Sequence, residues 1–563
     1  MTNKLVIIGG VAGGATAAAR ARRLNENAEI VMFERGPYIS FANCGLPYHI
    51  GGVIKKRDNL ILSTAEMFSK RHHVDVRINT DVLAIDRSGN TVRVRNLATG
   101  EEYSESYDKL ILSPGAEPVR PPFKGIDVQN IYTLRNLPDM DRINACIDEM
   151  SPLTAVVVGG GFIGLEMAEN LVFKGIKTTI IEKLDQVMAP LDKEMANFAH
   201  AHLREKNVEL ILGDGIRDFE KKDGSIIVHT EQGKRVVCDM VVLSVGIRPE
   251  TRLAMDAGLV LGETGAIEVD ATMRTSDPHI YAVGDAVEVR DYITGRKTMT
   301  PLAGPANKQG RIAADNVMNR SSVFCGTLGT AIVKIFDLAV AQTGLNEKTA
   351  LKWGVPYLTS YTHSGSHAGY YPGAETLSIK LLFSPGNGTI LGAQVVGKDG
   401  VDKRVDIIAT AIYAKMTVFD LQNLELAYAP PYGSAKDPVN IAGYVASNII
   451  KGDIENVYID ELDALDPQEY LLLDLRTKGE LKRSGQIKDA IHIPIDDFRD
   501  RMGELDNQKN YITYCAVGYR AYLAHRALIQ KGFKSKNLSG GYETYVMANM
   551  APPEEKSTES HEK

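Results

Sequence analysis

Two stretches of this chain repeat one pattern, and together they restrict its fold more than any other feature. In the first, an apolar run from Lys4 leads into Gly9-Gly10-Val11-Ala12-Gly13-Gly14, an alanine-rich segment and a second apolar run that ends at Glu34. In the second, the run 155–158 precedes glycines at 159, 161 and 164, and the next run ends at Glu182. Glycines permit a tight turn, a helix N-terminus meets a pyrophosphate, and the acid accepts a hydrogen bond from a ribose hydroxyl. The pattern predicts an α/β chain with two Rossmann-like dinucleotide-binding domains.

The two turns differ at one position, and the second carries a hint of cofactor preference. Val11 stands where the middle glycine of this fingerprint usually lies, so the second turn is the cleaner match. Glu182 would accept from a ribose 2′-hydroxyl and repel a 2′-phosphate, which favours NADH over NADPH. Lys183 beside it weakens this preference. NADPH therefore remains an alternative.

Length and composition bound the remaining possibilities. A chain of 563 residues indicates about three or four domains. The sequence has no run of about 18 apolar residues and no visible secretory signal, so we expect no membrane partner and a cytoplasmic location. The net charge of −7 argues against a nucleic-acid partner. Neither the five scattered cysteines nor the pair His72 and His73 has metal-ligand or disulfide-framework spacing, so no metal is expected.

Two of the cysteines stand in contexts that suggest chemistry. Cys44 lies in the segment Ser40–Pro47 (SFANCGLP), where a turn leads into a short helix, so we expect the pKa of its thiol to fall. Cys515 opens a six-residue loop between a strand and a helix that closes with Arg520, and the backbone N–H groups of such a loop can point at an anionic sulfur. The alternative for either is a small buried hydrophobe. Cys146, Cys238 and Cys325 have no activating neighbours and are taken as structural.

The order of parts along the chain is also informative. Residues 110–115 (LILSPG) and 241–246 (VVLSVG) are strand-to-glycine turns, and the apolar strand near residue 280 ends at Gly284-Asp285. This order resembles the flavin disulfide oxidoreductases with two dinucleotide-binding domains, in the pyridine nucleotide-disulfide oxidoreductase family. The lone cysteine of the SFANCGLP segment is similar to the branch of coenzyme A-disulfide reductases, NADH oxidases and NADH peroxidases.

The resemblance implies FAD on the first fingerprint and the nicotinamide cofactor on the second. It implies an FAD-binding domain at 1–150 and 272–323, an NAD-binding domain at 151–271 and an α+β dimerisation domain at 324–450. The implied FAD-binding residues are Gly9, Val11, Gly14, Glu34, Val82, Gly115, Gly284 and Asp285. The implied NAD-binding residues are Gly159, Gly161, Gly164, Glu182 and Gly246.

After a linker at 451–463 the pattern restarts. The strand 470–475, the segment 485–495 (GQIKDAIHIPI), the loop at Cys515 and the segment 538–542 (LSGGY) resemble a single α/β rhodanese domain, at 464–550. The cysteine of that loop carries a persulfide in rhodaneses. Gln486 departs from the histidine that many rhodaneses have there. The tail 551–563 is charged and is expected to be disordered.

The resemblance also suggests how a substrate is bound. Thr16, Arg20 and Arg23 are spaced i, i+4 and i+7, so they share one face of the first predicted helix, with Arg22 beside them. This basic face would suit a polyanionic thiol such as coenzyme A, although a solvated charged face is the plainer interpretation. In coenzyme A-disulfide reductases the matching positions contact coenzyme A, as do those of Ser40 and Asn43. Tyr370, Tyr428 and Lys436 would reach the active site of the other subunit, which implies a homodimer.

The main hypothesis is an FAD-dependent NADH reductase of persulfides or polysulfides, including coenzyme A persulfide, which releases sulfide. Cys44 would attack the sulfane sulfur, and Cys515 would deliver that sulfur from a donor. One alternative is a coenzyme A-disulfide reductase with a secondary rhodanese activity. Another is an NADH oxidase or peroxidase in which Cys44 cycles through a sulfenic acid. The last is a sulfur carrier or redox sensor, which would show negligible NADH turnover.

Overall fold

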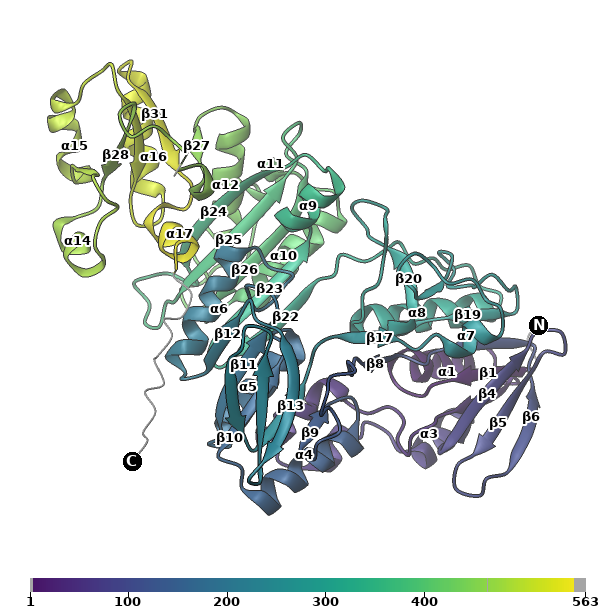
Figure 1. Ribbon diagram of the computed structural model, residues 1–563. Helices are drawn as coiled ribbons and strands as arrows, with labels where there is room; N and C mark the ends of the chain where they lie inside the picture. Colours follow the sequence, from purple (N-terminus) through teal and green to yellow (C-terminus); the bar gives the residue numbers. More distant parts are fainter. Residues whose placement is uncertain (1–3, 463, 551–563) are drawn as a thin grey trace. The chain divides into compact units, whose positions relative to one another are not determined.

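The computed structural model describes residues 4–462 and 464–550 (Figure 1). The tail expected to be disordered, 551–563, lies outside the described residues, as does residue 463 at the end of the predicted linker. The chain divides into two compact units. Unit 1 is drawn from Met1–Lys183 and Gly213–Gly329, and unit 2 from Leu184–Leu212 and Thr330–Lys563.

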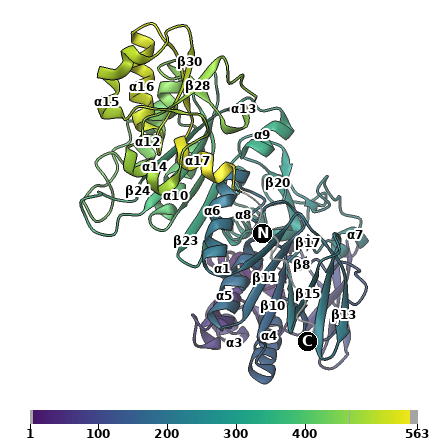
Figure 2. The same ribbon diagram turned by 60° about the vertical axis from the view of Figure 1, so that its left-hand side comes forward.

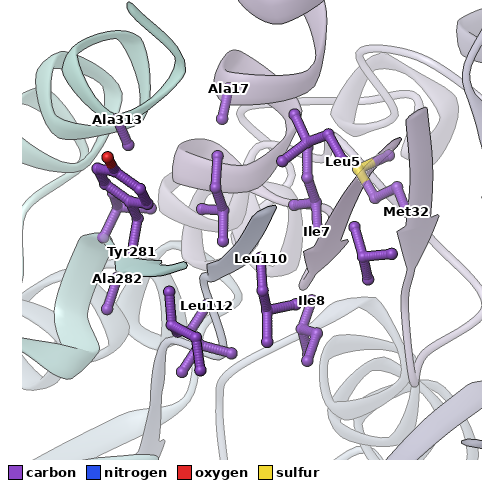
Figure 3. Close-up of a cluster of buried hydrophobic side chains, with 14 of the residues drawn as sticks. Leu5, Ile7, Ile8, Ala17, Met32, Leu110, Leu112, Tyr281, Ala282 and Ala313 are labelled. Carbon is purple, nitrogen blue, oxygen red and sulfur yellow. The ribbon is translucent and has the colours of Figure 1, made fainter. Parts of the chain in front are cut away.

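The first sheet of unit 1 is parallel and carries the first fingerprint. Its strand order is β19 (Ile280–Ala282), β7 (Lys109–Leu112), β1 (Lys4–Ile8), β2 (Glu29–Phe33) and β3 (Asp75–Arg77). Strand β1 reads KLVII and is buried along nearly its whole length, as a central parallel strand requires. Figure 3 shows its side chains packed between neighbours from the other strands and the helices above.

Helices α1 (Ala12–Leu24) and α8 (Ala303–Val317) cover this sheet. Their small residues let them approach closely, because a Cβ added at Gly310 would lie 2.3 Å from the carbonyl oxygen of Gly13. Figure 3 places Ala17 of α1 and Ala313 of α8 above the strands. A segment from the end of unit 1 thus completes the domain that its beginning starts.

The second fingerprint has its own parallel sheet. Strands β11 (Lys177–Glu182), β10 (Thr154–Val158), β16 (Met240–Leu243) and β9 (Ile131–Thr133) lie in that order. Helices α4 (Leu137–Met150) and α5 (Phe162–Phe173) belong to the same domain. The two repeated glycine turns lead into β8 (Ala116–Pro118) and β17 (Ile247–Pro249), which pair antiparallel with each other. The two repeated glycine turns therefore lead into a single two-stranded antiparallel ribbon, through which the chain passes between the two dinucleotide-binding domains.

Smaller elements complete unit 1. Two three-stranded antiparallel sheets are formed by β4 (Thr80–Asp86), β5 (Thr91–Asn96) and β6 (Glu102–Ser106), and by β13 (Ile216–Lys222), β14 (Ser225–Thr230) and β15 (Arg235–Cys238). A mixed three-stranded sheet contains β18 (Ile267–Glu268), which is parallel to β20 (Val287–Arg290), and β21 (Lys297–Thr298), which is antiparallel to β20. The short helices are η1 (Asn43–Gly45), α2 (Leu46–Ile50), η2 (Arg57–Leu60), α3 (Ala65–His72), α7 (Arg252–Asp256) and η3 (Gly284–Ala286).

Unit 2 begins with a five-stranded antiparallel sheet. Its order is β22 (Ala331–Ile335), β23 (Leu338–Gly344), β26 (Ile390–Gly397), β25 (Thr376–Phe383) and β24 (Leu358–Gly365). It is accompanied by α9 (Glu347–Trp353), α10 (Val401–Tyr413), α11 (Val418–Leu421) and α12 (Pro438–Ile450). The segment 184–212, with α6 (Lys193–Glu205) and β12 (Glu209–Leu212), also belongs to this unit.

The last part of unit 2 is a parallel sheet with helices on both faces (Figure 2). The order is β27 (Asn456–Val457), β31 (Lys534–Leu538), β30 (Asn510–Tyr514), β28 (Tyr470–Asp474) and β29 (Ile491–His492). Apolar residues of α15 (Ile495–Arg501) and α16 (Tyr519–Gln530) pack on one face, and those of α13 (Ile459–Leu462) and α17 (Gly541–Ala548) on the other. Helix α14 (Lys478–Ser484) and η4 (Met502–Glu504) complete it. The α/β class predicted from the sequence is confirmed.

None of the helices among residues 4–462 and 464–550 combines the length and the apolarity needed to cross a membrane.

Candidate active site

The first glycine turn is fixed by close backbone contacts. Gly9 has φ +97°, and a Cβ added there would lie 2.0 Å from the carbonyl oxygen of Ser113. A Cβ at Gly14 would lie 1.8 Å from the carbonyl oxygen of Gly9, so the helix could not begin this close to the strand with any other residue. The Glu34 carboxylate accepts hydrogen bonds from the backbone N–H groups of Gly10 at 2.9 Å and Gly36 at 2.8 Å. Burial raises the pKa of Glu34.

The second turn repeats this geometry. A Cβ at Gly164 would lie 2.0 Å from the carbonyl oxygen of Gly159, and Glu182 accepts from the N–H of Gly160 at 2.6 Å. Gly161 and Val11 hold equivalent places, each as the N-cap of the fingerprint helix. Apart from its chain neighbours, none of residues 4–462 and 464–550 places an atom within 4 Å of a Cβ built at Gly161, so the helix N-terminus has open space beside it. The exposed Lys183 ammonium lies 3.2 Å from the carboxylate of Glu231, which partly neutralises its positive charge.

The remaining predicted cofactor residues lie in the turns and short elements of unit 1. Gly115 and Gly246, with φ of +76° and +108°, end the two repeated turns. Gly284, in η3, donates its N–H to the side-chain oxygen of Gln309 at 2.8 Å. Burial raises the pKa of Asp285 beside it. Val82 is buried in β4 at an irregularity of the β4–β5 pairing.

Cys44 lies in the short 3₁₀ segment η1, directly before α2. The loop that leads to it is tied to the first glycine turn, because Ser40, with φ +46°, donates its N–H to the carbonyl oxygen of Gly10 at 2.9 Å. The Asn43 side-chain oxygen accepts from the N–H of Cys44 at 3.2 Å. Cys44 is exposed, so its sulfur is open to a reactant.

The expected fall in the pKa of Cys44 is wrong for this chain. Although Cys44 is exposed by its accessible surface, neighbouring protein atoms remove much of the water around the sulfur, and this burial raises the pKa of its thiol. The carboxylates of Glu166 and Asp285 raise it further. The helix that follows has only five residues, so its dipole does not outweigh burial and two negative charges.

Glu166 and Tyr48 are site residues that the sequence analysis missed. The hydroxyl of Tyr48, on α2, donates to the carboxylate of Glu166, on α5, at 3.2 Å. Burial raises the pKa of Glu166 to about 7. A carboxylate two residues after Gly164, inside the apolar helix FIGLEMAENLVF, was the available signal. Glu166 can therefore change its charge near neutral pH beside the reactive cysteine.

The basic face of α1 is only partly free. The hydroxyl of Thr16 donates to the Asn307 side-chain oxygen at 2.6 Å, and Arg20 pairs with Asp315 at 2.7 Å. Arg23 is exposed.

Arg22, predicted to bind coenzyme A, is instead buried in the protein. Its guanidinium donates to four backbone carbonyl oxygens, those of Asn25, Glu26, His72 and His73. Arg22 thus joins the ends of α1 and α3. Its guanidinium is occupied by these carbonyl oxygens, so the prediction that Arg22 binds coenzyme A is wrong.

In unit 2 the two predicted tyrosines meet. The hydroxyls of Tyr370 and Tyr428 are 2.8 Å apart, and the residues are 76% and 47% exposed. Lys436 is also exposed, and the next residue, Asp437, caps α12 and pairs with the buried Arg404 at 2.8 Å. The buried ion pair of Arg404 and Asp437 thus fixes the start of α12, next to the exposed side chain of Lys436.

The cysteine loop at the end of the chain directs a backbone N–H at the sulfur, as predicted, but it is shorter than predicted, because α16 begins at Tyr519 and Arg520 lies in its first turn. Cys515 is fully buried at the end of β30, and the N–H of Gly518 points at its sulfur from 3.2 Å. Gly518 has φ +94° as the N-cap of α16. The Arg520 guanidinium forms two hydrogen bonds to the Glu480 carboxylate and also interacts with Cys515. Gln486, the position without the usual histidine, donates to the carbonyl oxygen of Ala490 at 2.8 Å.

Three carboxylates among the described residues come close enough together to hold a metal ion: those of Asp192, Glu194 and Glu347. The Lys380 ammonium lies among them, 2.8 Å from Asp192 and 2.6 Å from Glu194, and also contacts Glu347. A lysine cation thus takes the place that a metal ion would need.

Comparison with known proteins identifies the class. The model of the pyridine nucleotide-disulphide oxidoreductases matches residues 3–310, that of their dimerisation domain residues 330–437, and that of rhodanese-like domains residues 458–548. The chain belongs to the pyridine nucleotide-disulphide oxidoreductase family. It is a flavin-dependent enzyme of the group that binds FAD and NAD(P)H, with a dimerisation domain and a rhodanese domain, as the sequence analysis expected.

Individual relatives narrow this further. The coenzyme A disulfide reductase of Staphylococcus haemolyticus is 36% identical over 79% of this chain and all of that protein. A reduced Bacillus anthracis protein named CoADR-RHD is 50% identical, with a TM-score of 0.95 over 97% of this chain and 98% of its own. A NAD-dependent persulfide reductase from A. fulgidus is 39% identical, with a TM-score of 0.91 over 96% and 100%. The predicted family is confirmed.

Proposed function

We propose that this protein is an NADH-dependent reductase of persulfide and polysulfide sulfur, including coenzyme A persulfide, and that it releases sulfide. One observation carries the proposal: the chain joins an exposed lone cysteine beside the two dinucleotide turns to a buried cysteine in a rhodanese loop. The likeness to the persulfide reductase of A. fulgidus, over 96% of the chain, supports it. Joining two sulfur sites in one chain raises their effective concentration toward each other.

The two glycine turns fit the two cofactors. The first turn, with Glu34, Val82, Gly115, Gly284 and Asp285, would hold FAD. The second, where the space at Gly161 is open and Glu182 stands at the strand end, would hold NADH, with NADPH as an alternative. When bound, these groups supply the transfer of electrons from the nicotinamide to sulfur.

The chemistry of this chain's own residues then centres on Cys44. Its thiolate attacks the outer sulfur of a persulfide R–S–SH, the donor S–S bond breaks, R–S⁻ leaves, and Cys44 carries S–SH. Two electrons and the protons that accompany them convert this group to the free thiol and H₂S. Burial lowers the fraction of Cys44 that is thiolate, and the charge of Glu166, whose own pKa is about 7, lowers it further.

Coenzyme A would bind beside Cys44 through Thr16, Arg20, Arg23, Ser40 and Asn43. We propose a homodimer in which Tyr370, Tyr428 and Lys436 of one subunit complete the site of the other. Their exposure in the single chain supports this, because it leaves the tyrosine pair available to a partner. The five free thiols fit the reducing cytoplasm.

Substitution of each cysteine tests the proposal. The purified enzyme should oxidise NADH faster with coenzyme A persulfide than with coenzyme A disulfide. Cys44→Ser should abolish both reactions and keep bound flavin, whereas Cys515→Ser should abolish sulfurtransfer and spare disulfide reduction. Cys325→Ser, which changes another exposed thiol, is the matched control. Wild-type rates in Cys44→Ser would remove the basis of the mechanism.

A second candidate is coenzyme A-disulfide reduction itself. The match to the whole length of the S. haemolyticus enzyme favours it. Faster turnover of the disulfide than of the persulfide would select it. Oxygen or peroxide consumption above both would instead select an NADH oxidase, the name of a Methanocaldococcus jannaschii relative that is 35% identical. Negligible NADH oxidation with every substrate would leave a sulfur carrier or sensor.

A further inference from the structure

The charge around the rhodanese loop limits which sulfur donor it can take. The six residues from Cys515 to Arg520, which form the loop and the first turn of α16, contain one cationic side chain, that of Arg520. Both terminal nitrogens of its guanidinium donate to the carboxylate of Glu480, at 2.8 and 2.5 Å. The same carboxylate accepts from the N–H of Thr477 at 2.9 Å and from its hydroxyl at 2.8 Å, because the two residues form the capping box of α14. Glu480 is thus held in place against Arg520.

The carboxylate of this ion pair is charged at neutral pH. Hydrogen bonding to Arg520 lowers the pKa of Glu480 to about 2, so Glu480 is ionised near pH 7. The positive charge of the loop is therefore balanced by a fixed negative charge. An anion on Cys515 is stabilised by the loop's backbone N–H groups, such as that of Gly518, and by Arg520, whose charge Glu480 offsets.

The charge of Arg476, which lies beside Tyr542, is also paired. Arg476 is 1% exposed, pairs with the buried Asp474 at 2.7 Å, and lies 3.8 Å from the ring centre of Tyr542. The N–H of Glu543 donates to the carbonyl oxygen of Ala516, so this acidic residue also lies against the loop.

The outer side of the loop is apolar and aromatic. Val517 and Tyr519 are 37% and 67% exposed. The basic residues of α14, Lys478, Lys482 and Arg483, are exposed to water, which screens their charges. The surface next to Cys515 is thus suited to contact the organic part of a donor.

Sulfur donors differ in the charge that they bring to this loop. From thiosulfate, the Cys515 thiolate takes the outer sulfur and releases sulfite, so two negative charges of the donor stay beside the loop throughout. From a persulfide R–S–S⁻, the thiolate takes the terminal sulfur, the S–S bond breaks, and R–S⁻ leaves and is protonated by water. In both reactions the cysteine ends as S–S⁻. The persulfide brings one negative charge fewer.

On the basis of the proposed sulfur-accepting role of Cys515, we propose that this loop takes thiol persulfides, whose reacting group carries one negative charge, and discriminates against thiosulfate, whose reacting group carries two. The pairing of Arg520 with Glu480 is the specificity device. Because the Glu480 carboxylate offsets the charge of Arg520, the pair offers no net positive charge to balance the second charge of a dianion.

The full-length flavin-loaded enzyme tests this with two donors, cysteine persulfide, whose net charge is that of one anion, and thiosulfate, and with cyanide as acceptor. We expect kcat/KM for the persulfide to exceed that for thiosulfate by at least about tenfold. Glu480→Gln frees Arg520 and should raise kcat/KM for thiosulfate by about tenfold or more, with less than about threefold change for the persulfide. Ala516→Arg, which adds a cation without breaking the capping box, should act in the same direction. Glu504→Gln, at another arginine-paired carboxylate of the same domain, should change neither.

The outcomes separate this inference from the proposed function. Equal use of both donors by the wild type, or an equal loss with both donors in Glu480→Gln and no gain in Ala516→Arg, would overturn the specificity. Sulfurtransfer that persists in Cys515→Ser would instead overturn the role of Cys515. Unchanged NADH oxidation with coenzyme A disulfide in every variant would show that the enzyme is intact.

Discussion

At the scale of single residues, the reactivity of Cys44 depends on a carboxylate from another helix. Glu166 raises the pKa of the Cys44 thiol when it is ionised, and its own pKa is about 7. Replacing it by glutamine removes this charge at all pH values. We therefore predict that Glu166→Gln lowers the pKa of the Cys44 thiol. The alkylation rate of the variant should exceed that of the wild type above about pH 7, and the difference should shrink at lower pH, where Glu166 is protonated.

The measurement is iodoacetamide alkylation followed by mass spectrometry of each cysteine peptide. The exposed Cys325 is an internal reference in the same samples. Glu101→Gln, at an exposed carboxylate of unit 1, is the control variant. An unchanged or higher thiol pKa in Glu166→Gln would show that Glu166 does not act on Cys44.

Residue identities could be predicted from the sequence where a motif encodes a backbone contact. The glycines at 9, 14, 159 and 164 meet carbonyl oxygens, and Glu34 and Glu182 accept from their own turns, as a short sequence pattern can encode. The pKa of Cys44 could not be predicted in this way. It depends on burial and on Glu166 and Asp285, which are far away in the chain and arrive only with the fold.

At the scale of elements, two neighbouring arginines of α1 have opposite roles. Arg22 is buried and satisfies four carbonyl oxygens, whereas Arg23 is exposed. Arg22→Gln should destabilise the protein by roughly 1–3 kcal/mol, since buried acceptors lose their donors, and should leave the KM for coenzyme A disulfide unchanged. Arg23→Gln should raise that KM and leave the stability unchanged. Thermal unfolding and steady-state kinetics check both, and the reverse assignment of effects would contradict the structure.

A second prediction concerns the buried lysine that joins three elements of unit 2. Lys380 of β25 is fully buried and pairs with Asp192 and Glu194 at the start of α6 and with Glu347 of α9. Lys380→Met would leave three carboxylates without their cation. We expect a loss of stability of roughly 3–5 kcal/mol, because unpaired buried charges are costly. The exposed Lys352→Met on α9 is the control. Equal thermal unfolding of the two variants would be the contrary result.

Elements could be predicted from local sequence patterns, but the elements that they pack against could not. The strand, turn and helix of each fingerprint follow from apolar runs and glycines. The unit to which α6 belongs does not follow from such a pattern. The sequence places residues 184–212 within the predicted domain 151–271, whereas in the structure they cluster with unit 2. There the side chain of Asn197 donates to the carbonyl oxygen of Met547 at 2.6 Å. This contact joins residues 350 positions apart in the sequence. The periodicity of apolar residues within a short segment cannot predict it.

At the scale of the whole molecule, the proposed site needs two copies of the chain. Cys44 belongs to unit 1, and the exposed pair Tyr370 and Tyr428 belongs to unit 2. Sequence reasoning could predict a dimer only through family resemblance, because a symmetric interface leaves no local pattern. The exposed tyrosine pair supports the proposal, because two large aromatic side chains lie on the surface of a single chain with their hydroxyls in contact.

A mixed dimer tests whether the site is shared. One subunit would carry Cys44→Ser, and the other Tyr370→Phe with Tyr428→Phe, each with a different affinity tag. If the tyrosines act on the partner's cysteine, one site of the mixed dimer holds all the substitutions and the other holds none. Activity with coenzyme A persulfide should then be about half that of the wild-type dimer, while each parent homodimer is slow, since in each both sites are impaired.

If instead the tyrosines served the cysteine of their own chain, both sites of the mixed dimer would carry a substitution. The mixed dimer would then be no faster than the mean of its two parents. A mixed dimer of Cys44→Ser with the wild type calibrates the measurement, because it keeps one intact site under either arrangement. Recovery to the level of that calibrating dimer is the expected result, because only a site built from two subunits can be restored by combining two defective chains.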